Sequence, residues 1–230
     1  MREVMFMDAI CKAALLQKAA ELDEGELALI NAQALRPLTV EEVFAFRLAA
    51  CDNQVDRDFE RFTDEALEEM AKLYVGKPVL RDHRWSNGSQ TARVYAAGVE
   101  ADGAVKRLVL RCYMPRTDKT ADTITAMESG IIRECSVGVT VGKSVCSVCG
   151  ANQVETICRH FGGREYDGQV CHFDLGDVRD AYEVSLVAVP AQKEAGIIKS
   201  KRYGGEEPPR INEKARQRAR ARLALEKARY

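Results

Sequence analysis

The sequence has no apolar run that approaches the roughly 18 residues needed for a membrane-spanning helix, so we predict no membrane partner. Neither sign of charge is in excess, because 34 Lys and Arg residues face 35 Asp and Glu residues and the net charge is −1. The chain as a whole is therefore not a polycation, and we predict no direct contact with nucleic acid. Asp8 and Lys12 interrupt the apolar residues near the N-terminus, so we expect no secretory signal and a cytoplasmic protein.

The composition is that of a folded protein, with 46% hydrophobic and 30% charged residues. Ala, Leu, Lys and Glu dominate residues 7–34, which predicts a helix, and we expect an N-terminal helical extension over residues 1–35. The main domain is expected over residues 36–200. A linker and a basic C-terminal tail are expected over residues 201–230, because two glycines and two prolines precede a segment rich in Arg. The tail is either a solvated or disordered end, or an arm that docks on an acidic partner surface.

The main domain has segments typical of helices and more segments typical of strands. Helices are predicted over residues 63–73, with Thr63 as the N-cap, and over residues 117–130. Strands are predicted over residues 43–50, 78–80, 92–99, 105–114, 135–141, 170–175 and 181–189. Because these elements do not alternate regularly, we predict an α+β fold, a mostly antiparallel β-barrel of about six or seven strands with flanking helices.

Eight cysteines are unusual for a cytoplasmic chain of this size, and their spacing divides them into two groups. Four are scattered and are expected to be small buried hydrophobic residues: Cys11, Cys51, Cys112 and Cys135. The other four, Cys146, Cys149, Cys158 and Cys171, crowd into one short segment together with His160 and His172. In a reducing compartment such a cluster indicates a metal site rather than disulfides. We therefore predict a metal-binding insert over residues 144–173.

Zinc is the metal that this donor set favours, because it binds four thiolate or imidazole ligands in tetrahedral geometry. Cys146 and Cys149 form a Cys-x-x-Cys pair, and the other ligands would come from Cys158, His160 and Cys171, with His172 a weaker candidate. Five good ligands compete for four places, and the sequence does not decide between Cys158 and His160. The expected role is structural, since four protein ligands leave no open position for water. The alternative is a loop with reduced, unliganded thiols.

Three polar residues of the main domain stand out by their position. His83 is the single histidine outside the insert and follows a predicted strand. Ser136 begins a strand just after a helix, and Glu183 lies in the apolar strand Tyr182–Val187. A carboxylate in so apolar a strand requires a polar partner, and a histidine is suitable. Each of the three residues, taken alone, is also consistent with a structural role.

Four segments in order resemble the prohead serine proteases of tailed phages, the capsid maturation proteases related in fold to the herpesvirus assemblins. They are Pro78-Val79-Leu80-Arg81-Asp82-His83, Arg93-Val94, Cys135-Ser136-Val137-Gly138 and Glu183-Val184-Ser185-Leu186-Val187-Ala188-Val189-Pro190-Ala191. The resemblance covers residues 40–198, and the cysteine-rich insert is similar to one that some members carry. It implies a herpesvirus-protease-like barrel and a serine endopeptidase with Ser136 as nucleophile, His83 as general base and Glu183 as the residue that orients the histidine.

The resemblance also implies partners and a place of action. The enzyme would cleave the scaffolding segment or the N-terminal segment of the major capsid protein, and itself, inside the phage procapsid in the host cytoplasm. Self-association as a homodimer is implied as well. The chain departs from the family at Thr91-Ala92-Arg93-Val94, where many members have Ile-Gly-Arg-Val, and it lacks the assemblin arginine pair, which leaves the oxyanion donors unassigned.

Two alternatives stay open from the sequence. One is a non-catalytic, zinc-stabilised head-assembly module with the same fold. The other makes Cys135 the nucleophile in place of Ser136; adjacent residues of a strand point to opposite faces, so only one of the two can face His83.

Overall fold

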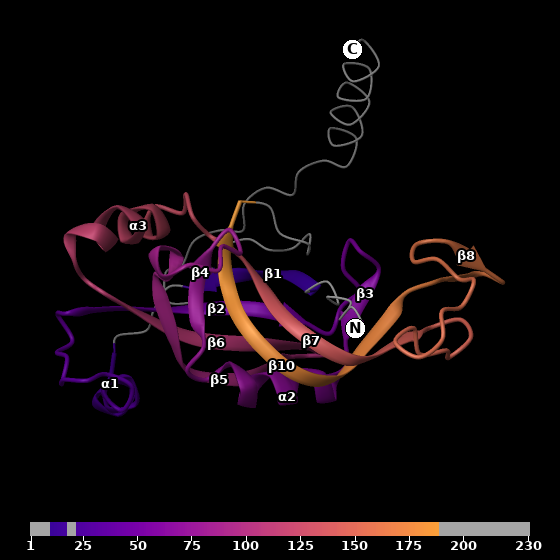
Figure 1. Ribbon diagram of the computed structural model, residues 1–230, viewed down its shortest axis with the longest axis horizontal. Helices are drawn as coiled ribbons and strands as arrows, with labels where there is room; N and C mark the ends of the chain where they lie inside the picture. The colour runs from indigo at the N-terminus through magenta and orange to yellow at the C-terminus, as the bar shows by residue number, and fades with distance from the viewer. Residues whose placement is uncertain (1–9, 18–21, 189–230) are drawn as a thin grey trace, which may run out of the picture. The chain divides into compact units, whose positions relative to one another are not determined.

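The computed structural model describes residues 10–17, by their backbone, and residues 22–188. Eight strands form one sheet in the order β3-β10-β4-β5-β6-β2-β1-β7, and β7 also pairs with β10 (Figure 1). The pairings of β10 with β3 and β4 are parallel, and the others in this sheet are antiparallel. The strands are β1 (Ile10–Gln17), β2 (Val43–Asp52), β3 (Glu60–Phe62), β4 (Pro78–Arg81), β5 (Ala92–Asp102), β6 (Val105–Pro115), β7 (Glu134–Cys146) and β10 (Phe173–Val187).

Three α-helices, α1 (Glu24–Asn31), α2 (Asp64–Tyr74) and α3 (Asp118–Glu128), accompany the sheet in the described part of the chain. The prediction of an α+β fold with a mostly antiparallel sheet is confirmed. None of the helices in that part is both long and apolar enough to cross a membrane.

Helix α2 lies against β5, β6 and β10 (Figure 1). It begins at the predicted cap, where the Thr63 hydroxyl accepts a hydrogen bond from the Ala66 backbone N–H at 3.2 Å. Its apolar side chains enter the core at helical spacing, among them Leu67, Met70 and Tyr74. Gly76, with φ of +84°, provides the left-handed residue that redirects the chain toward β4.

The N-terminal helix predicted over residues 7–34 is wrong for much of its length. Ile10–Gln17 form strand β1, which pairs antiparallel with β2 and with β7, and only Glu24–Asn31 are helical. Pairing with the backbones of two neighbouring strands outweighs the helix propensity of Ala, Leu and Lys, because that propensity is small per residue. The predicted tail over residues 201–230 lies outside the described residues.

Strands β7 and β10 are the longest of the sheet and carry the residues of interest. The two strands predicted over residues 170–175 and 181–189 are one continuous strand from Phe173 to Val187. Its pairing with β7 is shifted between Val178 and Asp180 and again between Ala181 and Glu183. Because of these bulges, one strand continues through a segment that the sequence predicted to separate two strands.

One face of β7 and β10 belongs to the core. Cys135, Val137 and Val139 of β7 and Val184 and Leu186 of β10 are buried in the main hydrophobic cluster. Because side chains alternate along a strand, the residues between them face the opposite side of the sheet.

The Tyr74 hydroxyl holds the two strands together from α2. It lies 3.2 Å from the backbone carbonyl of Gly138 on β7 and 3.2 Å from that of Glu183 on β10. Gly138 and Glu183 are paired across the strands, directly beside the second bulge. A buried phenol that bonds both strands therefore fixes the backbone at Glu183.

Candidate active site and metal centre

A tight turn after β4 carries His83. The Arg84 N–H donates to the Arg81 carbonyl at 3.0 Å, and the two central residues, Asp82 and His83, both have φ of +53°. Two consecutive positive φ values are uncommon outside glycine and are the sign pattern of a type I′ turn. The Asp82 N–H donates to the Leu186 carbonyl at 3.0 Å, so the turn is fastened to β10. Strained backbone of this kind is concentrated at functional sites.

His83 contacts Glu183 directly, although 100 residues separate them. Nδ1 of His83 lies 2.8 Å from Oε1 of Glu183, whose side chain is 2% exposed, while the histidine side chain is 28% exposed. An ionised carboxylate only accepts hydrogen bonds, so a neutral histidine in this position donates from Nδ1 and keeps the lone pair on Nε2. The arrangement is a histidine side chain oriented by a buried carboxylate.

Ser185 connects the same two residues, and sequence reasoning had given it no role. Its hydroxyl accepts a hydrogen bond from the His83 backbone N–H at 3.1 Å and donates one to Oε2 of Glu183. Both carboxylate oxygens of Glu183 are thereby bonded. The available signal was spacing, because Ser185 follows Glu183 by two residues in a strand and must share its face.

Ser136 lies on the neighbouring strand, on the face that carries Glu183. In the β7–β10 register Ser136 is opposite Ser185 and Gly138 is opposite Glu183. Residues directly opposite in an antiparallel pair lie on the same face, with Cα atoms about 4.5–5.5 Å apart. Ser136 is 4% exposed. The fold therefore brings Ser136 next to the serine that bonds both His83 and Glu183.

Cys135 lies on the other face of β7. It is fully buried in the core cluster, and burial raises the pKa of its thiol well above the ordinary value. A thiol held protonated among apolar side chains is a poor nucleophile. The alternative in which Cys135 replaces Ser136 is therefore wrong.

The position of the Glu183 carboxylate leaves no room for a side chain at residue 138, so glycine is required there. A Cβ atom at Gly138 would lie 2.7 Å from Oε1 of Glu183, and that oxygen cannot move without losing its hydrogen bond to His83. We expect Gly138→Ala to lower the free energy of unfolding by about 1–3 kcal/mol, measured by urea denaturation.

Gly98→Ala on β5 is the matched control, since a Cβ atom there would meet nothing within 4 Å. It should raise the free energy of unfolding slightly, by about 0.5 kcal/mol. Equal effects of the two substitutions would show that the carboxylate is not held against Gly138.

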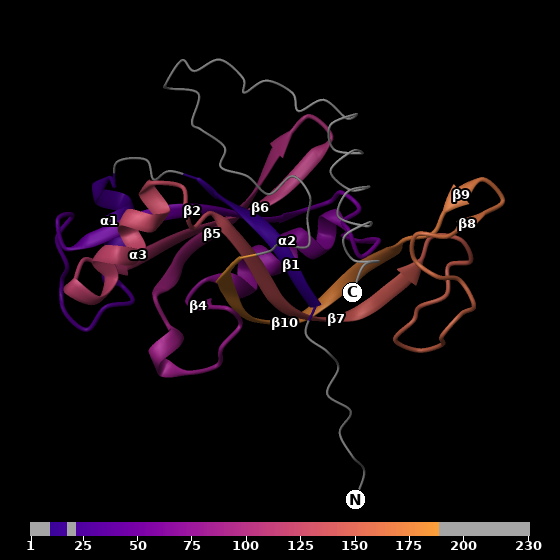
Figure 2. The same ribbon diagram turned by 90° about the horizontal axis from the view of Figure 1, so that it is seen from above.

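The second site is in the insert between β7 and β10, at the far end of these strands from the His83 turn (Figure 2). One ligand atom from each of Cys146, Cys149, Cys158 and His160 lies within 4.8 Å of all the others, so the group can hold a metal ion. This group contains both Cys158 and His160, the two candidate ligands between which the sequence did not decide.

Cys171 is the predicted ligand that this group of four leaves out. Its Sγ atom lies 3.8 Å from Sγ of Cys146, but it does not belong to the set whose members are all within 4.8 Å. His172 is also outside the group, and its Nε2 faces Asp174 at 3.4 Å.

Backbone N–H groups act on all three thiols of the cluster, but the pKa is lowered only at Cys146 and Cys158. At Cys149 the Ala151 N–H lowers the pKa less than burial and the neighbouring thiols of Cys158 and Cys146 raise it. Burial acts to raise the pKa of the Cys146 thiol, but hydrogen bonds from the backbone N–H groups of Cys149 and Val148, together with those of the Cys149 and Cys171 thiols, outweigh it, and the pKa is lowered. At Cys158 the largest influence is the backbone N–H of His160, which lowers the pKa of the thiol. Three thiols, one imidazole and N–H donors to sulfur form a donor set that fits a structural metal ion.

A short hairpin, β8 (Glu165–Tyr166) and β9 (Gln169–Val170), extends from the insert. Its turn, Asp167-Gly168, has positive φ at both residues. The Tyr166 ring meets the His160 ring edge to face, with centroids 4.6 Å apart, and the Tyr166 hydroxyl accepts a hydrogen bond from the Phe161 N–H at 3.1 Å. The hairpin thus orients the imidazole of the cluster.

Comparisons of the chain with protein-family models, with curated proteins and with solved structures found no match.

Proposed function

We propose that the chain is a serine endopeptidase in which Ser136 is the nucleophile, His83 the general base and Glu183 the residue that orients the histidine. The observation that carries the proposal is the hydrogen bond from His83 to a buried Glu183 on the strand that pairs with Ser136. A serine hydroxyl is a weak nucleophile near neutral pH and requires such a base.

The chemistry follows from the proton positions. Oγ of Ser136 attacks the carbonyl carbon of the scissile peptide bond while its proton moves to Nε2 of His83. The imidazolium then gives that proton to the leaving amine nitrogen as the C–N bond breaks. Water hydrolyses the acyl-enzyme with His83 again as base. Glu183 stabilises the imidazolium, and Ser185 holds the second carboxylate oxygen so that the first stays on Nδ1.

We further propose that the reaction belongs to phage prohead assembly, with the scaffolding or N-terminal capsid protein segments as substrates inside the procapsid. The support is the resemblance of four segments to the prohead proteases. We propose a herpesvirus-protease-like barrel for the sheet; the support is that the strand pairings lead from β10 through β4, β5, β6, β2, β1 and β7 back to β10. Self-association as a homodimer is part of the same proposal.

The metal that we propose for Cys146, Cys149, Cys158 and His160 is zinc in a structural role. Bound there, zinc supplies cross-links between distant parts of the insert. The cluster and the His83 turn are at different ends of β10, so no catalytic step is assigned to it.

Labelling with a fluorophosphonate tests the proposal on the purified chain. Attack by Ser136 forms a bond from Oγ to phosphorus and releases fluoride, so we expect one label per chain on the tryptic peptide Glu134–Lys143. Labelled protein should no longer cleave the major capsid protein. Absence of both the label and the cleavage would leave a non-catalytic, zinc-stabilised head-assembly module as the better interpretation.

A further inference from the structure

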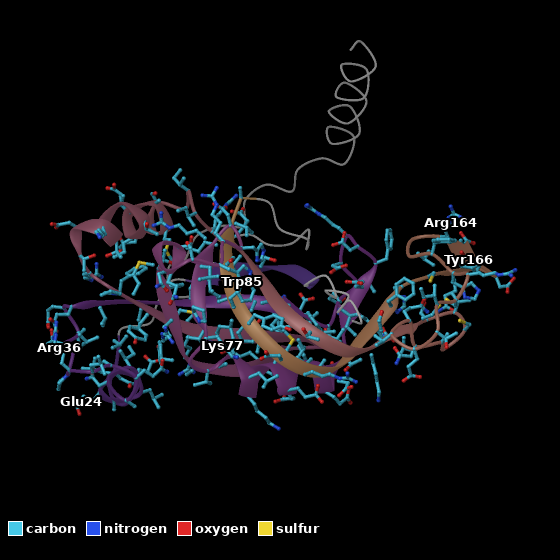
Figure 3. All side chains as sticks on the ribbon, viewed as in Figure 1. Glu24, Arg36, Lys77, Trp85, Arg164 and Tyr166 are labelled. Atoms are coloured by element: carbon cyan, nitrogen blue, oxygen red, sulfur yellow. The ribbon has the colours of Figure 1, made fainter. Side chains whose placement is uncertain are left out.

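Two aromatic side chains adjoin the candidate catalytic residues in the sequence and meet in space. Trp85 follows His83 by two residues, and Tyr182 directly precedes Glu183. Their ring centroids are 5.7 Å apart with an interplanar angle of 61°. Trp85 is the single tryptophan of the chain and is 68% exposed, and Figure 3 shows it beside β10. Most of this large apolar side chain is therefore not covered by the described residues.

Tyr182 is held in place by its position in β10 and by a residue of β7. It is the extra residue of the second bulge in β10, between Ala181 and Glu183. Its hydroxyl shares a hydrogen bond with the hydroxyl of Thr140 on β7. By strand alternation Thr140 lies on the same face as Ser136 and Gly138. That face thus carries, in order along β7, the nucleophile, the glycine under the carboxylate and the support for the aromatic pair.

We infer that Trp85 and Tyr182 form a subsite for an apolar side chain of the substrate peptide, close to the scissile bond. This inference rests on the proposed function. The pair is joined to His83 and Glu183 by one or two residues of chain, so a peptide placed over Ser136 passes near it. Aromatic rings that are fixed and partly exposed bind apolar side chains at low entropic cost.

The local charge argues for an apolar occupant rather than a cationic one. The His83 turn carries Arg81 and Arg84, both exposed, against the single acid Asp82. Asp180, the next acidic residue along β10, is paired with Lys77 at 3.3 Å. A Lys or Arg side chain of the substrate would meet excess positive charge at the rings, which offsets a cation–π attraction.

Cleavage of a proteome-derived peptide library tests the subsite, with the cut sites read by mass spectrometry. Wild type should show an enrichment of Leu, Ile, Met or Phe at one fixed position relative to the cut. In Trp85→Ala that enrichment should fall about tenfold, while Trp85→Phe should retain most of it. Leu35→Ala, which removes an exposed apolar side chain from the segment between α1 and β2, should leave it unchanged.

Fluorescence gives a second readout that does not depend on turnover. Because Trp85 is the single tryptophan, its emission in the Ser136→Ala variant should shift to the blue when a peptide of the preferred sequence is added. Cleavage by wild type without any apolar preference, a preference for Lys or Arg, or a preference unchanged in Trp85→Ala would overturn the inference alone. No Ser136-dependent cleavage of the library would overturn the proposed function, and the subsite with it.

Discussion

Ser136→Ala is expected to lower the rate of capsid protein cleavage by about 10⁴-fold or more, because the variant has no hydroxyl to form the acyl-enzyme. The fold should persist, since the change removes one oxygen atom from a strand whose backbone pairings are unaffected. Coexpression with the major capsid protein, followed by measurement of processed and unprocessed chains, gives the first readout. Single-turnover kinetics on the purified proteins then gives the magnitude.

Ser185→Ala is the matched control, because Ser136 and Ser185 are opposite each other and both are buried. In the proposed mechanism Ser185 is a positioning residue, and its loss frees Oε2 of Glu183 and the His83 N–H without removing the proposed nucleophile. We expect about a 10- to 100-fold loss of rate, with the fluorophosphonate label on Ser136 retained but formed more slowly. If Ser136→Ala processed the capsid protein at more than about one hundredth of the wild-type rate, Ser136 would not be the nucleophile.

The sequence singled out His83 and Glu183, which meet in the structure, but it did not show how they are arranged. Glu183, an acidic residue in an apolar strand, required a polar partner, and in the structure His83 is that partner. The contribution of Ser185 was missed because a serine in a strand is unremarkable until its neighbours are known. The left-handed turn at Asp82 and His83 was missed as well, since neither residue type signals positive φ as glycine does.

The fold was predicted where local chemistry decides it and missed where distant pairing decides it. The Thr63 cap depends on a few adjacent residues, and it appears as predicted. Strand β1 depends on its pairing with β2 and β7, which are distant in sequence, so its composition indicated a helix instead. Likewise, the sequence could not show that Phe173–Val187 stay in one strand, because β7 supplies the partner groups on both sides of each bulge.

Loss of the proposed zinc ion is expected to unfold the insert while the sheet remains folded. Most residues of the insert from Ser147 to Val170 are exposed or half-buried, so few apolar contacts are available to order them. Binding of a structural zinc ion in small domains contributes about 10–16 kcal/mol, which is far more than such contacts supply. Wild type should contain one equivalent of zinc, measured by elemental analysis, and Cys149→Ser should contain less than about a tenth of that.

Trypsin reports the structural consequence, because Arg159 and Arg164 are both in the insert. In Cys149→Ser, or in wild type treated with a chelator, cleavage at these two residues should accelerate by about 100-fold or more, whereas cleavage within the sheet should not change. Cys171→Ser is the discriminating control, since Cys171 lies near Cys146 but outside the group of four. It should keep its zinc; loss of the metal there, with retention in His160→Asn, would assign the fourth position to Cys171 and remove His160 from the site.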